Sequence, residues 1–169
     1  GDRLSVETPG GGGVFPPKEK PRHLVFSFGS NMDLAQIQKR CPSARLITRA
    51  RVQDVALRYT RYSDLRKGGV ADMYHASGET VWGLLFDVGD DDLKTLDDIE
   101  CRGNAYQRIS VKAIDDNDGV WEAYAYDVID KRPDIPPTKL YEWQVYSGAY
   151  MLNVPDFYLK RIKSFRVDS

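Results

Sequence analysis

Two short segments of the chain carry residue types that could act together on a small molecule. The Gly-Ser-Asn segment at residues 29–31 separates an apolar run from a helical pattern, so its backbone N–H groups could bind a carboxylate or an oxyanion. Glu100 ends a second helical pattern, where the helix dipole and the neighbouring Asp97 and Asp98 favour a raised carboxyl pKa. A general base beside an anion-binding turn would result. An ordinary capping turn and a solvated helix end explain the same residues, and spacing alone does not choose.

Other catalytic chemistries find little support in the sequence. The chain has only two histidines, neither with a second ligand at helical spacing, and Cys41 and Cys101 lack the paired spacing of a zinc site. Ser30 lacks the second glycine of a nucleophile elbow, so we interpret it as a cap or a ligand contact. No Gly-rich dinucleotide fingerprint follows a predicted strand. We therefore expect neither a metal nor a cofactor.

The composition indicates a soluble chain with one core. Its 169 residues, 41% of them hydrophobic, are enough for one sizeable core and few for two domains. The 24 basic and 25 acidic residues are spread along the chain, which disfavours a nucleic-acid partner. No apolar run has the length of a membrane span and no signal peptide is evident, so a cytoplasmic protein without a membrane partner is expected. Residue 1 is Gly rather than Met, which leaves an upstream leader open.

The sequence predicts a tail followed by one folded domain. Residues 1–21 contain four consecutive glycines followed by three prolines among charges, which favours a flexible tail outside the core. Residues 22–169 form the domain. Strands precede most of the helices, so we expect an α+β fold. The expected strands are 23–28, 44–62, 69–76, 80–88, 106–115 and 120–129, the expected helices are 32–39, 90–100, 138–151 and 155–165, and hairpin turns are expected at 78–79 and 116–119.

Three landmarks occur in the chain in a characteristic order. The first reads aromatic-small-aromatic-Gly-Ser-Asn-apolar, the second has Val-Trp-Gly ahead of an acidic helix, and the third is rich in tyrosine and ends in a helix opened by prolines. They are residues 26–32, residues 81–88 with 96–100, and Tyr106 with residues 123–126 and 136–141. With these landmarks the chain resembles the gamma-glutamylcyclotransferase family over about residues 23 to 163.

This resemblance implies a fold, a reaction and a set of site residues. The fold is α+β, with a mixed, strongly curved or barrel-like β-sheet and peripheral helices. The reaction is an intramolecular aminolysis that converts a γ-glutamyl amine or peptide to 5-oxoproline and free amine, without a cofactor. Glu100 aligns with the family's catalytic glutamate. The implied substrate-binding residues are Phe28, Gly29, Ser30, Asn31, Met32, Tyr106, Tyr124 and Tyr141, with a buried core position as the alternative for each tyrosine.

Two departures from the family pattern bear on the substrate preference, and the second of them, Cys101, keeps another class of function open. Phe28 stands where the family often has Tyr, and Cys101 stands where it usually has Gly. A non-catalytic binding module for an amino-acid-like ligand would keep the same pocket, and a turnover assay separates it from an enzyme. Cys101 itself is expected to be a spectator, because neighbouring carboxylates raise a thiol's pKa. The expected partner is a small γ-glutamyl compound, and the sequence is compatible with a homodimer.

Overall fold

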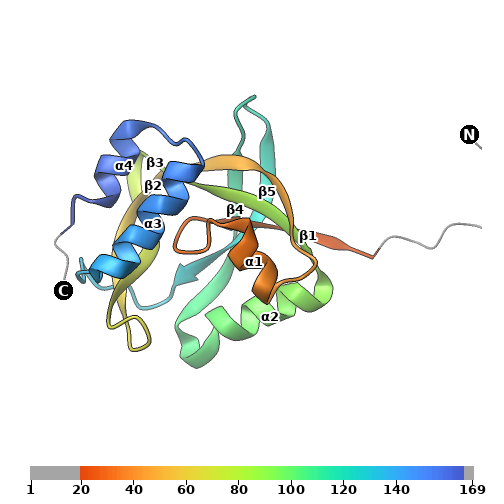
Figure 1. Ribbon diagram of the computed structural model, residues 1–169, viewed down its shortest axis with the longest axis horizontal. Helices are drawn as coiled ribbons and strands as arrows, with labels where there is room; N and C mark the ends of the chain where they lie inside the picture. The colour runs from red at the N-terminus through yellow and green to blue at the C-terminus, as the bar shows by residue number, and fades with distance from the viewer. Residues whose placement is uncertain (1–19, 166–169) are drawn as a thin grey trace, which may run out of the picture.

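A closed five-stranded β-barrel surrounded by helices forms the domain (Figure 1). The computed structural model describes residues 20–165, so most of the tail predicted at 1–21 lies outside the described residues and its flexibility stays a prediction. The α+β class and the barrel-like sheet are confirmed. The elements are β1 (Arg22–Ser27), α1 (Leu34–Arg40), β2 (Arg45–Ser63), β3 (Gly68–Gly89), α2 (Asp90–Glu100), the 3₁₀ turn η1 (Arg102–Asn104), β4 (Tyr106–Ile114), β5 (Val120–Val128), α3 (Lys139–Met151) and α4 (Asp156–Ile162).

The barrel is built on one long hairpin. β2 and β3 pair antiparallel along nearly their whole length, and register shifts bend the pair. β1 lies antiparallel to β3 on one side and parallel to β5 on the other, while β4 pairs with β5 and meets β2 at Arg51 and Ile114. The strand order β1-β3-β2-β4-β5 therefore closes on itself, which removes open sheet edges.

One predicted turn is wrong. The sequence predicts a hairpin turn at Gly78 and Glu79, but β3 runs unbroken through this point. Gly78 does have a positive φ of 83°, and its N–H donates to Asp54 Oδ1 at 3.0 Å. This geometry belongs to a bulge where the register between β2 and β3 shifts. The strands predicted at 69–76 and 80–88 are therefore one strand, and the chain reverses instead at residues 64–67.

Two apolar cores lie on opposite faces of the strands. The first joins one face of the sheet to α3 and α4. Phe26 of β1 and Val145 of α3 both belong to it. The second joins the other face to α1 and α2 and includes Val25, Phe86 and Leu96. Neighbours on β1 fall in different cores because side chains alternate along a strand. The second core fixes α2 against the barrel.

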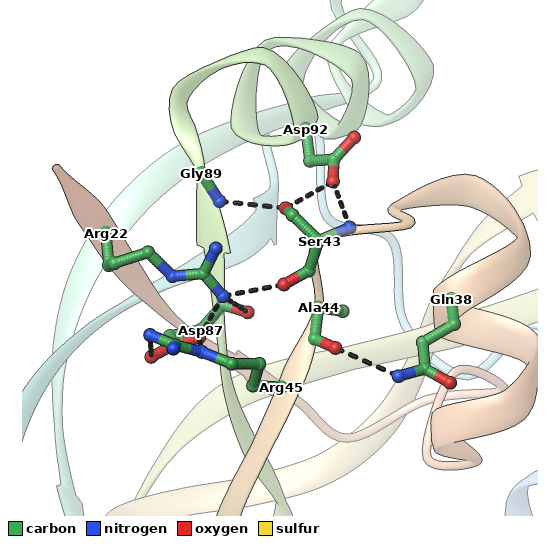
Figure 2. A network of polar contacts seen from close by, with 8 residues as sticks. All are labelled: Arg22, Gln38, Ser43, Ala44, Arg45, Asp87, Gly89 and Asp92. Carbon is green, nitrogen blue, oxygen red and sulfur yellow. Dashed lines mark hydrogen bonds and ion pairs between the residues drawn. The ribbon is translucent and has the colours of Figure 1, made fainter. Parts of the chain in front are cut away.

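A polar network holds the N-terminal end of α2 (Figure 2). Asp92, in the first turn, accepts hydrogen bonds from the backbone N–H of Ser43 at 2.8 Å and from its hydroxyl. The same hydroxyl accepts the N–H of Gly89 at 3.0 Å, and Arg22 donates to the Ser43 carbonyl at 2.6 Å. α2 is therefore tied to the start of β2, and this anchor sets the position of Glu100 at the other end of the helix.

None of the helices in residues 20–165 combines the length and the apolar character that crossing a bilayer requires.

Candidate active site

A cavity of about 390 Å³ lies where four segments meet: the β1–α1 connection, the β2–β3 turn, the C-terminal end of α2, and α3. Its volume falls in the range of small-molecule sites, roughly 300–1,000 Å³. The barrel thus brings together residues that are more than a hundred positions apart in the chain. Of the nine residues predicted at the site, seven line this cavity: Glu100, Phe28, Gly29, Ser30, Asn31, Tyr106 and Tyr141.

Glu100 is the last residue of α2, and its side chain forms part of the cavity wall. Within residues 20–165 it makes no hydrogen bond or ion pair. Its removal from water raises the pKa of Glu100 above the ordinary value, although the positive charges of Arg40, Arg66 and Arg61 oppose the rise. A carboxylate without a partner and with a raised pKa is well suited to accept a proton from a ligand.

The 29–31 turn supplies backbone donors to the same cavity. Its three N–H groups donate no hydrogen bond to any part of the chain that the structure describes, so they are available to an anion. Sequence reasoning places this turn at the start of a helix, but α1 begins only at Leu34. Asp33 is the N-cap, because its side chain accepts the N–H of Ala35 at 2.9 Å. The turn can therefore offer an anion its own amides, whereas the N-terminal end of α1 lies further along the chain.

Arg66 and Tyr141 pack against this turn. Arg66 donates to Ser30 Oγ at 3.2 Å, and its guanidinium carbon lies 5.3 Å from the ring centre of Tyr141. The Tyr141 hydroxyl accepts a backbone N–H of β3 at 3.0 Å. Burial raises the pKa of Tyr141 to about 12, so the hydroxyl stays protonated and can donate to a ligand. A Cβ at position 29 would lie 3.3 Å from this hydroxyl, a tight contact that Gly29 avoids.

Tyr124 is not among the residues that line the cavity. Its ring instead lies under Arg108, with 4.3 Å from the guanidinium carbon to the ring centre. Tyr126, two positions further along the same face of β5, lines the cavity and donates to Asp97 at 2.7 Å. Alternate residues of a strand share a face, so the sequence gives a signal for both tyrosines but not for which one reaches the cavity.

Of the two remaining predicted site residues, one lines the cavity and the other lies in the core. Tyr106 lines the cavity, with the guanidinium carbon of Arg61 5.9 Å from its ring centre, and burial raises its pKa far above the usual range. Met32 is buried in the core. A Cβ added to Gly148 would lie only 2.9 Å from the Met32 Cβ, so Met32 packs closely against α3.

Four arginines in the cavity lining escaped sequence reasoning: Arg40, Arg61, Arg66 and Arg102. They come from α1, from β2, from the β2–β3 turn and from η1. No fixed spacing links them, and a lone arginine in a sequence is most often a solvated surface residue. Only the fold shows that they share one cavity.

Metal-ligating side chains do not gather in the described part of the chain: no three His, Cys, Asp or Glu residues there are placed to hold an ion. The fold and the site define a small α+β barrel protein whose cavity has the volume of a small-molecule site and is lined by a partly buried carboxylate. The chain belongs to the gamma-glutamyl cyclotransferase, AIG2-like family, whose model matches residues 25–150. The resemblance drawn from the three sequence landmarks is confirmed.

Relatives with this name are distant in sequence and similar in fold. The mouse gamma-glutamylcyclotransferase is 26% identical over 152 residues, which cover 87% of this chain and 80% of the mouse protein. The human gamma-glutamylcyclotransferase is 27% identical over 146 residues, covering 83% of this chain and 77% of the human one. A solved structure of a gamma-glutamyl cyclotransferase is 25% identical and has a TM-score of 0.82. The match covers 88% of this chain and 90% of that structure's chain.

Proposed function

We propose that this protein is a gamma-glutamylcyclotransferase-type enzyme, which converts a γ-glutamyl amine or peptide to 5-oxoproline and a free amine. The observation that carries the proposal is Glu100: a carboxylate without a partner in residues 20–165, with a raised pKa, in the cavity that also holds the free amides of the 29–31 turn. The family relationship and the relatives named gamma-glutamylcyclotransferase support the choice of reaction.

The reaction needs one group that first accepts and then returns a proton. The substrate's α-amino group is an ammonium near neutral pH and must lose a proton before its nitrogen can attack the γ-carbonyl carbon. Glu100 accepts that proton, and the neutral amine then forms the new C–N bond. As the bond to the leaving nitrogen breaks, Glu100 passes the proton to that nitrogen, and it carries the second proton that the attacking nitrogen must lose along the same path. The lactam nitrogen keeps one hydrogen, the amine leaves as an ammonium, and Glu100 ends as the carboxylate it was at the start.

The cavity contributes mainly by holding a folded substrate. Attacking and leaving groups belong to one molecule, so fixing the amine beside the γ-carbonyl supplies a large part of the rate. The amides of residues 29–31 can stabilise the oxyanion of the tetrahedral intermediate or hold the substrate's α-carboxylate. Tyr106 and Tyr141 keep their hydroxyl protons because burial raises both pKa values. They can donate hydrogen bonds to either group.

The test compares Glu100→Gln with Asp98→Asn. Asp98 is exposed on the same helix and its side chain makes no hydrogen bond within residues 20–165, so its variant removes an equal charge close by. On a panel of γ-glutamyl compounds, 5-oxoproline release by Glu100→Gln should fall on the order of a hundredfold to ten-thousandfold, while Asp98→Asn stays near wild type. Both variants should remain folded.

Two outcomes would overturn the proposal. Near-normal turnover by Glu100→Gln would exclude Glu100 as the base. If the wild-type protein binds γ-glutamyl compounds saturably, yet releases no 5-oxoproline from any of them, the protein is a binding module rather than an enzyme.

A further inference from the structure

The arginines of residues 20–165 fall into two groups. Of the twelve, eight form an ion pair with an aspartate or glutamate, including strongly exposed ones such as Arg132 with Asp130. The four that have no carboxylate partner within residues 20–165 all line the cavity. The paired group is Arg22, Arg45, Arg49, Arg51, Arg58, Arg108, Arg132 and Arg161, and the cavity group is Arg40, Arg61, Arg66 and Arg102.

The cavity arginines have few partners of any kind. Arg66 is held by neutral oxygens, those of Ser30 and of an α3 glutamine side chain at 2.8 Å. Arg40, Arg61 and Arg102 have guanidinium groups that make no hydrogen bond within the described range. The acids in the lining are Glu100 and one exposed aspartate of the β2–β3 turn. The cavity therefore carries an excess of positive charge.

This excess is larger than the glutamyl half of a substrate can balance. That half brings one carboxylate and one ammonium, and the amides of the 29–31 turn together with Arg66 suffice for the carboxylate. Arg40 and Arg61 line the same cavity as Glu100, and their positive charges oppose the rise of its pKa. Guanidinium groups match carboxylates in bidentate geometry. Arg40, Arg61 and Arg102 remain, and acid groups on the other half of the substrate would balance their charges.

We infer that the leaving half of the substrate is a dicarboxylic amino acid, so that the preferred substrates are γ-glutamyl-glutamate and γ-glutamyl-aspartate. This inference rests on the proposed function and names its substrate class. Arg40, Arg61 and Arg102 come from three separate segments, which lets them surround an α-carboxylate and a side-chain carboxylate of the leaving amino acid. A cavity of about 390 Å³ has room for such a dipeptide.

A matched pair of peptides isolates the second acid group. γ-Glutamyl-glutamate and γ-glutamyl-glutamine have the same shape and differ only in the leaving side chain, an acid or its amide. The value of kcat/KM should be about tenfold or more higher for the glutamate peptide. γ-Glutamyl-ethylamide, whose leaving half has no acid, should be slower than both. Equal rates for the two peptides, or faster turnover of the ethylamide, would overturn the inference.

Variants show whether the arginines cause the preference. Arg61→Gln and Arg102→Gln should each lower the ratio of kcat/KM between the two peptides by several-fold, and the corresponding lysine variants should keep part of it. Arg132→Gln, outside the cavity, should leave the ratio unchanged. Thermal melting of each variant confirms that it is folded. An unchanged ratio in folded Arg61→Gln and Arg102→Gln would contradict the assignment.

Failure of the proposed function can be told apart from failure of this inference. If the wild-type protein releases no 5-oxoproline from any peptide, the enzyme proposal fails, and calorimetry then measures the Kd of the two peptides directly. Tighter binding of the glutamate peptide would support the charge preference on its own. Equal Kd values would overturn it.

Discussion

Asp87 and Glu100 stand at the two ends of α2, and both lie among arginines. Asp87, on β3 just before the helix, lies between Arg22 and Arg45, with 3.1 Å from Arg45 Nε to its Oδ1 (Figure 2). Glu100 ends the helix and has arginine charges around it but no ion pair within residues 20–165. The charge of Asp87 is thus neutralised by arginines of the protein itself, whereas the charge of Glu100 has no such partner within residues 20–165.

The pKa values of Asp87 and Glu100 therefore differ from their ordinary values in opposite directions. Burial disfavours the charged form of Asp87, but hydrogen bonds from Arg45 and Arg22 outweigh it and hold its pKa below the ordinary value. At Glu100 burial outweighs the more distant arginine charges, and its pKa is raised. Direct contact rather than the number of nearby arginines decides the sign. A buried carboxylate near arginines that do not touch it is therefore a better functional candidate than one that is fully paired.

The largest stability effect should come from Asp87→Asn. Two guanidinium groups lose their charged partner, so the free energy of unfolding at pH 7 should fall by about 2 kcal/mol, a value reduced for the exposure of Arg45. Because the folded-state pKa of Asp87 is lowered, its contribution is present above the ordinary value of 3.8 and is lost as pH falls through the folded value. Urea unfolding at pH 7 and near pH 3 measures both effects. The matched control is Asp130→Asn, an exposed pair, which should change stability by less than about 1 kcal/mol.

Glu100→Gln should have a smaller effect on stability, of the opposite sign. A raised folded-state pKa means that the contribution of Glu100 is present below its ordinary value of 4.5 and is lost as pH rises through the folded value. Glutamine does not ionise, so the variant loses no stability in this way as the pH rises. Calorimetry should therefore give the variant a higher Tm than the wild type at pH 8, with a gap that narrows on acidification. A lower Tm at pH 8 would mean that Glu100 is a structural partner of the arginines, and the contrast with Asp87 would fail.

Much of the local structure could be predicted because local signals decide it. The apolar run of β1, the acidic first turn of α2 and the Asp-Asn-Asp-Gly turn before β5 each carry their own pattern. In that turn the Asp115 side chain accepts the N–H of Gly119 at 2.8 Å, as expected of such sequences. Gly78 misled prediction because a glycine with positive φ fits a bulge as well as a hairpin turn.

The rest depends on pairing between distant strands. Closure of the barrel requires β1 to lie beside β5, with Val25 opposite Tyr124, and no residue pattern fixes that contact. The resemblance to a family supplied the curved sheet instead. The choice of Tyr126 over Tyr124 for the cavity, and the gathering of four arginines there, follow from that closure. These are the features that sequence reasoning could not reach.

The smallest effect should come from Cys101→Ala, beside the catalytic candidate. Burial, followed by the charges of Asp97 and Glu100, raises the pKa of Cys101, so the thiol is protonated and is a poor nucleophile near neutral pH. Its backbone N–H donates to the Asp97 carbonyl at 2.9 Å, a bond that alanine keeps. We expect a change in unfolding free energy of less than about 1 kcal/mol and turnover within about twofold of wild type.

The backbone explains why a cysteine is tolerated where the family usually has glycine. Cys101 has φ −88° and ψ 2°, a conformation open to any residue, whereas the left-handed φ of 64° in this turn falls at Gly103. Cys101→Gly should therefore gain nothing in activity and lose a little stability, because glycine is more flexible in the unfolded chain. Measuring 5-oxoproline release and melting on both variants separates the roles: loss of turnover in a folded Cys101→Ala would require a covalent mechanism, and Glu100 would then have to act on the thiol rather than on the substrate.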